Sequence, residues 1–260
     1  MRLQCGKSGI LLFAAGRLSN MKNKLLDKTF QVLEAVAASP EPVSLKELSG
    51  RLGINASTLS RIASDLVEAG YLTKSGYRRF EPALGLIRLG QNAVHSSHLP
   101  RTVNPMVKNR AEELGVNGAF AGIERGQLVY LFRSDAFSGE SRIGLPYRVP
   151  LYRSNIAIAI LAMSLPAEEA LAQFRDDIRA RKGNAAELDE IKPLLEHVVR
   201  NGYLFRREPE ARWNITFPVE YGGRFYGLSF YGDRAGERNF DRLLFECSLL
   251  ASRIRSALAG

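Results

Sequence analysis

The sequence has few of the residues that build disulfide frameworks and metal sites. Its 260 residues include two cysteines, Cys5 and Cys247, and three histidines. Two cysteines so far apart offer no disulfide framework and no zinc-ligand spacing, which favours a reducing compartment. His95 and His98 have a spacing that could place both on one helix face, but a surface helix is the better interpretation. We therefore expect no metal ion, no cofactor and a cytoplasmic location.

Long apolar segments are also missing. The run at residues 10–15 is too short to span a membrane and resembles a secretory signal only faintly. Met21 opens a stretch that is typical of a protein start. We therefore interpret residues 1–22 as an irregular extension or the product of an upstream start codon, with a targeting signal as the alternative. No association with a membrane is expected.

Motifs of the common enzyme classes are absent as well. The sequence contains no Gly-x-Ser-x-Gly elbow, no zinc motif and no dinucleotide fingerprint. Gly6-Lys7-Ser8 resembles the end of a phosphate-binding loop, but Met1 stands where that motif requires a glycine. His197 falls within an amphipathic helical pattern, which indicates a surface residue rather than a catalytic base. These absences disfavour an enzyme.

What the chain does have is positive charge. It holds 36 Lys and Arg against 27 Asp and Glu, a net charge of +9, and the excess is concentrated before residue 99. A basic balance favours a polyanionic partner, either nucleic acid or an anionic membrane surface. The hydrophobic content of 45% is enough for a packed core. The length allows one large domain or two ordinary ones.

Two helices are predicted in the first part of this basic region. Apolar residues recur at helical spacing over residues 24–38, and Pro40 prevents that helix from continuing. Ser44 and Glu47 have the spacing of a capping box, in which each residue bonds the backbone of the other. They predict a short second helix that stops at Gly53, a typical C-terminal glycine.

A third helix, capped by Asn55 or Ser57 and ending at Ala69, carries a polar face suited to the major groove of DNA. Its apolar residues fall on one side, and short hydroxyl side chains and Arg61 fall on another. Short side chains allow close approach to bases, and an arginine can reach guanine or phosphate. The alternative is a merely solvated surface. The residues of this helix expected to contact DNA are Ser57, Thr58, Ser60, Arg61 and Ser64.

A basic hairpin follows the third helix. Residues 71–74 and 77–80 are predicted strands joined by a two-residue turn at residues 75–76. Two helices followed by a basic hairpin are the order of a winged helix-turn-helix. Its wing would touch phosphates or the minor groove. The further residues expected at DNA are Ser44, Lys74, Arg78 and Arg79.

Residues 27–90 resemble the DNA-binding half of the IclR family of bacterial transcriptional regulators. The segments that carry the resemblance are residues 29–33, 44–48, 52–54, 57–61, 66–72 and 80–90. The resemblance implies a winged helix-turn-helix domain over residues 23–82, a linker helix over residues 83–99 and double-stranded operator DNA as the partner.

The remaining residues, 100–260, are predicted to form a second domain that begins at Pro100. Consecutive strands without an alternation of strand and helix predict an antiparallel sheet flanked by helices, so the fold class is α+β. The order of segments also resembles the IclR family, whose C-terminal half is a GAF-like effector-binding domain. Strands are predicted at 117–124, 127–133, 213–219 and 225–230, and helices at 102–114, 156–165, 167–180, 187–201 and 240–258.

The resemblance also implies an effector pocket. After Leu151 this chain departs from the family pattern of a histidine and small residues, and has Tyr152-Arg153-Ser154 instead. Two candidate arginines beside hydroxyl and amide groups would suit a small organic anion. Ordinary strand residues and solvated arginines are the alternative. The predicted effector-binding residues are Val149, Arg153, Ser154, Asn155, Ile156, Asn214, Ser229 and Tyr231, with Arg206 near the place of an acidic residue in the family.

The function implied is that of a transcriptional regulator controlled by a small-molecule effector, a small carboxylate. The resemblance also implies self-association as a dimer or tetramer through the effector domain and linker. Paired recognition helices would then meet two half-sites. Two alternatives are a repressor with a degenerate pocket that needs no effector, and an enzyme with an appended DNA-binding domain.

Overall fold

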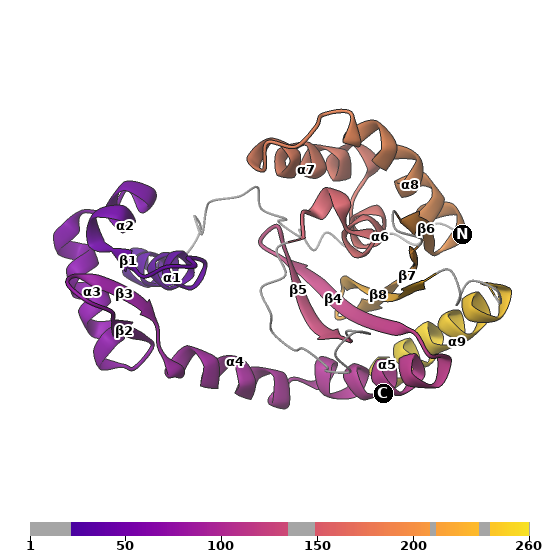
Figure 1. The fold of residues 1–260 in the computed structure, drawn as a ribbon, viewed down its shortest axis with the longest axis horizontal. Helices are drawn as coiled ribbons and strands as arrows, with labels where there is room; N and C mark the ends of the chain where they lie inside the picture. The colour runs from indigo at the N-terminus through magenta and orange to yellow at the C-terminus, as the bar shows by residue number, and fades with distance from the viewer. Residues whose placement is uncertain (1–21, 135–148, 209–211, 234–239, 260) are drawn as a thin grey trace. The chain divides into compact units, whose positions relative to one another are not determined.

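The computed structural model describes residues 22–134, 149–208, 212–233 and 240–259. These residues form two compact units, divided between Ser97 and His98. Each unit has its own helices, sheet and hydrophobic core (Figure 1). Within the described part of the chain, no helix is both long and apolar enough to cross a membrane.

The first unit is a winged helix-turn-helix. Its small antiparallel sheet has the strand order β1-β3-β2, with Val43 opposite Phe80 and Lys74 opposite Phe80 on the other side. The elements are α1 (Lys24–Ala37), β1 (Val43–Ser44), α2 (Leu45–Leu52), α3 (Ala56–Glu68), β2 (Leu72–Lys74), β3 (Arg79–Pro82) and α4 (Leu84–Ser96).

Local signals fix the helix ends of this unit. The capping box of Ser44 and Glu47 is present as predicted, and α2 ends at Gly53 in the left-handed conformation, with φ 65°. Asn55 caps α3, because its side chain accepts a hydrogen bond from the backbone of Thr58. Helix faces and strand residues then meet in one core, built from Val32, Val36, Val43, Leu48, Ile54, Leu59, Ile62, Ala63, Leu66, Leu72 and Phe80.

The hairpin differs from the prediction in its turn. β2 ends at Lys74 and β3 begins at Arg79, so residues 75–78 connect the strands and the predicted two-residue turn is wrong. Gly76 and Arg78 both have positive φ, at 78° and 53°, which bends the loop before the chain can pair again. The short strand β1 was not predicted, since two residues carry no periodic signal.

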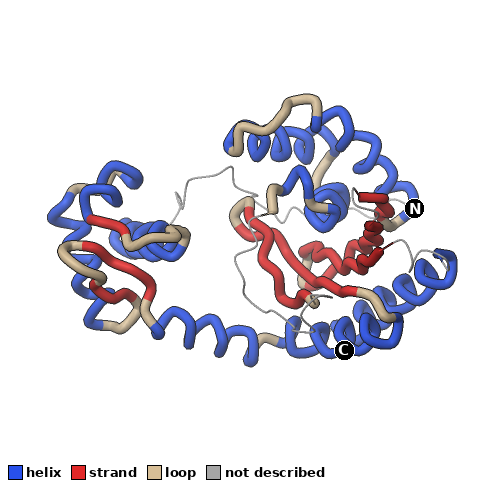
Figure 2. The backbone as a smooth tube through the Cα atoms, viewed as in Figure 1, coloured by secondary structure: helices blue, strands red, loops and turns tan. Residues whose placement is uncertain are grey.

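The second unit contains a five-stranded sheet, whose strands are drawn in red in Figure 2. The strand order is β5-β4-β8-β7-β6, and every neighbouring pair is antiparallel. The predicted α+β class is confirmed. The elements are α5 (His98–Leu114), β4 (Asn117–Glu124), β5 (Gln127–Arg133), the 3-10 helix η1 (Leu151–Arg153), α6 (Asn155–Ser164), α7 (Ala167–Ala180), α8 (Glu187–Asn201), β6 (Leu204–Glu208), β7 (Arg212–Tyr221), β8 (Arg224–Asp233) and α9 (Phe240–Ala259).

The two faces of this sheet bury side chains of different size. One face packs large residues such as Phe120, Phe132 and Phe230 against α5 and α9. The other face has Ala119 and Ala121, which let α6 lie close to the strands, with α7 and α8 beyond α6 (Figure 1). Alternation along the strands produces this division, apart from a register shift between β4 and β5. The sheet is therefore the middle layer between two groups of helices.

α5 and β6 differ from the prediction. α5 begins at His98, earlier than predicted, with Pro100 inside its first turn. A proline is tolerated there because a first-turn N–H has no partner within the helix. Strand β6 was not predicted, although it pairs with β7 along its length, with Leu204 opposite Thr216. Its sequence, Leu-Phe-Arg-Arg-Glu, has no apolar–polar alternation.

Candidate nucleic-acid interface and ligand cavity

Four side chains of α3 form one exposed polar stripe, which we call the α3 stripe. Ser57, Ser60, Arg61 and Ser64 are spaced i, i+3, i+4 and i+7, so they share one face of the helix, and all four are exposed. Thr58 lies beside the stripe and is half-buried. The opposite face is buried in the core, which holds the stripe toward solvent, and consists of Leu59, Ile62, Ala63 and Leu66.

The loop of the hairpin presents an aromatic and a basic residue together. Tyr77 is 84% exposed, and the guanidinium carbon of Arg78 lies 5.1 Å from the centre of its ring. Lys74 is exposed at the end of β2. Sequence analysis placed Tyr77 in a strand and missed it as a candidate surface residue. Its position at the tip depends on the longer loop, which has no local signal.

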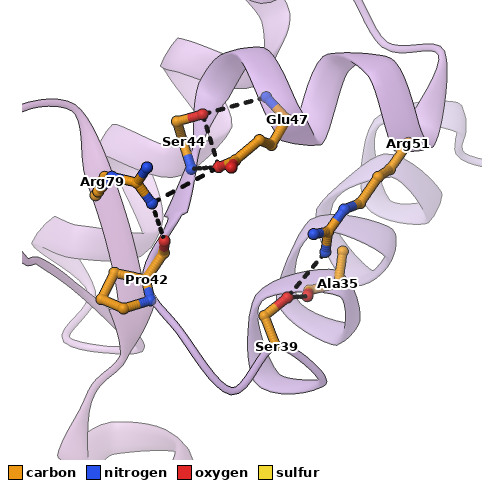
Figure 3. A network of polar contacts seen from close by, with 7 residues as sticks. All are labelled: Ala35, Ser39, Pro42, Ser44, Glu47, Arg51 and Arg79. Atoms are coloured by element: carbon orange, nitrogen blue, oxygen red, sulfur yellow. Dashed lines mark hydrogen bonds and ion pairs between the residues drawn. The ribbon is translucent and has the colours of Figure 1, made fainter.

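Ser44 and Arg79 form hydrogen bonds within the domain (Figure 3). Arg79 Nη1 donates to the Pro42 carbonyl at 2.6 Å and lies 3.9 Å from Glu47 Oε2. That carboxylate also accepts hydrogen bonds from the Ser44 backbone N–H and hydroxyl, at 2.7 and 2.8 Å. These bonds from Ser44, assisted by the charge of Arg79, lower the pKa of Glu47. Both predicted residues thus join β1, β3 and the start of α2.

A second polar connection joins α2 to the end of α1. Arg51 Nη1 donates to the Ser39 hydroxyl at 3.0 Å, and that hydroxyl donates to the Ala35 carbonyl at 2.9 Å (Figure 3). Together with the contacts of Glu47, the hydrogen bond of Arg51 connects both ends of α2 to the rest of the unit. The helix that precedes α3 is therefore held firmly against the rest of the unit.

The start of α4 is fixed by two glycines. The Gly85 N–H donates to the Gly70 carbonyl at 3.1 Å, and a Cβ on Gly85 would lie 2.2 Å from that oxygen. Beyond this contact α4 has no buried residue. Leu84 is 80% exposed and Ile87 is 55% exposed, and Leu89 is exposed to the same extent as Ile87. A helix that exposes several apolar side chains is a candidate interface.

The second unit contains a cavity of about 180 Å³ on the α6 side of the sheet. All of the predicted effector-binding residues except Arg206 line it. Arg206 donates a hydrogen bond of 3.2 Å to Asn155 Oδ1, so it contacts the lining from β6 without joining it. Sequence analysis missed five lining residues, which are Ala119, Tyr130, Arg133, Arg212 and Trp213.

Strand register explains why distant residues meet in this cavity. Asn214 pairs with Tyr231 and Ser229 pairs with Ala119, so their side chains lie in neighbouring rows on one face. Ser229 Oγ donates to Asn214 Oδ1 at 2.8 Å. Thr216 Oγ1 lies 2.9 Å from the same oxygen, so two buried hydroxyl groups contact the half-buried Asn214 amide.

Arg153 is largely occupied by an ion pair. Its Nε and Nη2 atoms donate to the two carboxylate oxygens of Glu187 at 3.1 and 3.0 Å. The hydrogen bonds raise the pKa of Arg153 and lower that of Glu187. The Arg153 side chain is also 61% exposed. This arginine therefore braces η1 against α8 at the rim of the cavity.

The other residues singled out in the sequence, two histidines and one cysteine, have contacts or burial within the fold. His98 Nδ1 lies 3.4 Å from the Tyr221 hydroxyl. His197 is half-buried, with its ring edge-on to Tyr203 at 5.5 Å, so it is less exposed than the predicted surface position implies. Burial raises the pKa of Cys247 to about 12, which keeps its thiol protonated. Among the residues with described positions, no group of three His, Cys, Asp or Glu side chains could hold a metal ion.

A winged helix-turn-helix with an exposed polar recognition helix, joined to an antiparallel-sheet domain with a small cavity, is the arrangement expected of a DNA-binding transcriptional regulator. Residues 25–76 match the IclR helix-turn-helix domain. The chain is 24% identical over 183 residues to the regulator KdgR of Escherichia coli K12, covering 68% of each chain. It is 22% identical over 188 residues to KipR of Bacillus subtilis 168, covering 70% of this chain and 73% of the other.

Two solved structures have the same fold. An IclR family regulator from Brucella abortus aligns with a TM-score of 0.74 at 19% identity, over 90% of this chain and 92% of that one. An IclR homologue from Microbacterium hydrocarbonoxydans, solved with 4-hydroxybenzoate, aligns with a TM-score of 0.65 at 17% identity, over 90% and 99%. The helix-turn-helix match and the similarity to these regulators confirm the resemblance to the IclR family found in the sequence.

Proposed function

We propose that operator binding by this regulator is controlled by a small organic acid that occupies the cavity of the second unit. The observation that carries the proposal is the charge of the lining. Its described residues include Arg133, Arg153 and Arg212 but no aspartate or glutamate. A cavity with cationic walls favours an anion, and guanidinium groups bind carboxylates through two parallel hydrogen bonds.

The size and walls of the cavity support a compact acid. Its volume of about 180 Å³ is below the roughly 300–1,000 Å³ of pockets that hold drug-sized ligands. Val149 and Ile156 supply apolar contacts, and Tyr130 and Tyr231 supply aromatic ones. The Microbacterium homologue was solved with 4-hydroxybenzoate, an acid with one ring. A carboxylate on a short or single-ring skeleton fits both the charge and the size.

For DNA we propose a division of roles within the first unit. The α3 stripe contacts base edges in the major groove, with Arg61 as the residue that reads a base. Lys74 and Arg78 contact phosphates at the wing. Ser44 and Arg79 act indirectly, because their hydrogen bonds to Glu47 and Pro42 set the position of α2 relative to β3.

We also propose that the protein functions as a dimer or a higher assembly. The exposed apolar side chains of α4, among them Leu84 and Ile87, would be covered by a second copy of the chain. Two copies would place two recognition helices at half-sites about one helical turn apart, or a multiple of it. The corresponding domain assignment is residues 23–82 for DNA binding, 83–99 for the linker and 100–260 for effector binding.

Calorimetric titration of the full chain with acetate, pyruvate, succinate, benzoate and 4-hydroxybenzoate tests the acid assignment. The proposal expects saturable binding of at least one acid and no binding of the corresponding amide. Absence of binding by every acid, combined with tight binding to an operator, would support the alternative of a repressor that needs no effector.

A further inference from the structure

The wall of the cavity formed by β5 depends on a β-bulge. Along β4 and β5, Ala119 pairs with Arg133 and Ala121 pairs with Tyr130, with a register shift between these pairs. Leu131 is the extra residue on β5. Residues three apart in a regular strand face opposite sides of the sheet. Because the bulge adds a residue, Tyr130 and Arg133 face the same side, which is the side covered by α6.

The bulge is held from the opposite side of the sheet. The side-chain amide of Asn104 in α5 donates a hydrogen bond of 2.8 Å to the Leu131 carbonyl. A bulge disturbs the ladder at the inserted residue, so its carbonyl needs a partner outside the regular pairing. Asn104 supplies that partner, and the Leu131 side chain packs against the core beneath α5 and α9.

Two aromatic rings position the guanidinium of Arg133. Its central carbon lies 5.3 Å from the centre of the Tyr130 ring and 5.8 Å from that of the Tyr231 ring. The Tyr231 hydroxyl donates to the Ser134 carbonyl at 2.6 Å, which fixes this ring beside the arginine. Aromatic contacts use the flat faces of a guanidinium, whereas its N–H groups lie in its plane.

We propose that Arg133, and not Arg153, is the residue that binds the carboxylate of the effector. The proposal rests on the proposed function, in which the effector is an acid. Arg133 is half-buried, so its charge acts in surroundings of lower effective dielectric than the rim. Arg153 is more exposed, with 61% of its side chain accessible, so solvent screens its charge more strongly.

Asn104 is a positioning residue in this scheme. It does not line the cavity, but without it the Leu131 carbonyl loses its bond and the bulge can slip toward regular pairing. A slip of one residue would turn either Tyr130 or Arg133 to the other face of the sheet. Replacing Asn104 should therefore weaken acid binding by the same route as replacing Arg133, though by a smaller factor.

The test is titration of the full chain with 4-hydroxybenzoate, benzoate, succinate and pyruvate, each compared with its amide. Arg133→Gln should weaken binding of the preferred acid by roughly 10- to 100-fold and remove the preference for acid over amide, since a charged hydrogen-bonding partner is lost. Arg133→Lys should recover part of the affinity. Arg153→Gln should change affinity by less than about 5-fold.

Arg224→Gln is the matched control, because it also removes the charge of one arginine. Arg224 lies on β8, outside the cavity lining, and forms an exposed ion pair with Glu124 at 3.0 Å. Its affinity should equal that of the parent. Thermal unfolding of each variant identifies any that fails to fold, and Arg133→Lys then carries the test.

The outcomes separate the two proposals. If no acid binds the parent, the acid effector is contradicted and the role of Arg133 with it. If an acid binds the parent and Arg133→Gln retains both the affinity and the preference for acid over amide, only the assignment of Arg133 is overturned. A loss confined to Arg153→Gln would likewise overturn it in favour of the rim arginine.

Discussion

The guanidinium of Arg153 donates two hydrogen bonds to the carboxylate of Glu187, at 3.1 and 3.0 Å, and so joins η1 to the first turn of α8. Asp177 of α7 secures the same segment, because its Oδ2 accepts the Leu151 N–H at 2.6 Å. The 3-10 helix at the rim of the cavity is thus attached to two helices. Its position depends on carboxylates, and its stability should depend on pH.

Glu187→Gln provides the test of this dependence. The pairing with Arg153 holds the pKa of Glu187 below 4.5, so its contribution to stability is present above that pH and is lost as pH falls through the lowered value. The free energy of unfolding of the parent should therefore exceed that of Glu187→Gln at pH 7, and the difference should shrink below about pH 4.5. Chemical denaturation at several pH values measures it. A difference that is independent of pH would contradict the account.

The proposed division between base-reading and phosphate-binding residues predicts two kinds of mutant. Arg61→Ala should weaken binding to the operator by about 1–3 kcal/mol and relax the preference at one base position. Arg78→Ala should weaken all sequences alike and reduce the slope of log affinity against log salt by about one. Fluorescence anisotropy over a salt series distinguishes the two. Unchanged operator binding by Arg61→Ala at every salt concentration would show that Arg61 reads no base.

The close contact between Gly85 and Gly70 predicts opposite effects of the same substitution at two positions of α4. Gly85→Ala should destabilise the first unit, because a Cβ would lie 2.2 Å from a backbone oxygen that cannot move freely. Gly90→Ala, where nothing lies within 4 Å, should stabilise the helix by up to about 1 kcal/mol. Thermal unfolding compares the two variants. Equal effects would mean that Gly85 is not packed against Gly70.

The exposed apolar surface of α4 predicts self-association without DNA. The parent should sediment as a dimer or larger at micromolar concentration, and Leu84→Ser with Ile87→Ser should weaken the assembly, since these side chains are 80% and 55% exposed in one chain. Arg88→Ser, in the same helix, is the control for a change of sequence without loss of apolar surface. A parent that sediments only at 28.8 kDa would contradict the proposal.

Features set by neighbouring residues could be predicted from the sequence. The capping box of Ser44 and Glu47 is one, because both partners lie within a single helical turn. The antiparallel sheet is another, because strands that follow each other without intervening helices have few ways to pair. The predicted effector-binding residues that line the cavity came from the family resemblance, since no local pattern joins Asn155 to Asn214.

Features set by distant contacts could not be predicted. Arg79 bonds to the Pro42 carbonyl, 37 residues earlier, so its sequence position in a basic hairpin indicated only a phosphate contact. The bulge at Leu131 involves the register with β4 and a hydrogen bond from Asn104, 27 residues earlier. Regular alternation would put Tyr130 and Arg133 on opposite faces, and neither was among the predicted lining residues.

The most direct test of acid control is the affinity of the full chain for an operator, measured with and without the acid that binds it by calorimetry. Operator fragments can be selected from the source genome with the protein itself. Because binding at two sites is linked, an acid that controls DNA binding must change operator affinity, and the operator must change acid affinity by the same factor. We predict a change of roughly 5- to 150-fold that is absent in Arg133→Gln. Binding of the acid with no change in operator affinity would contradict the account.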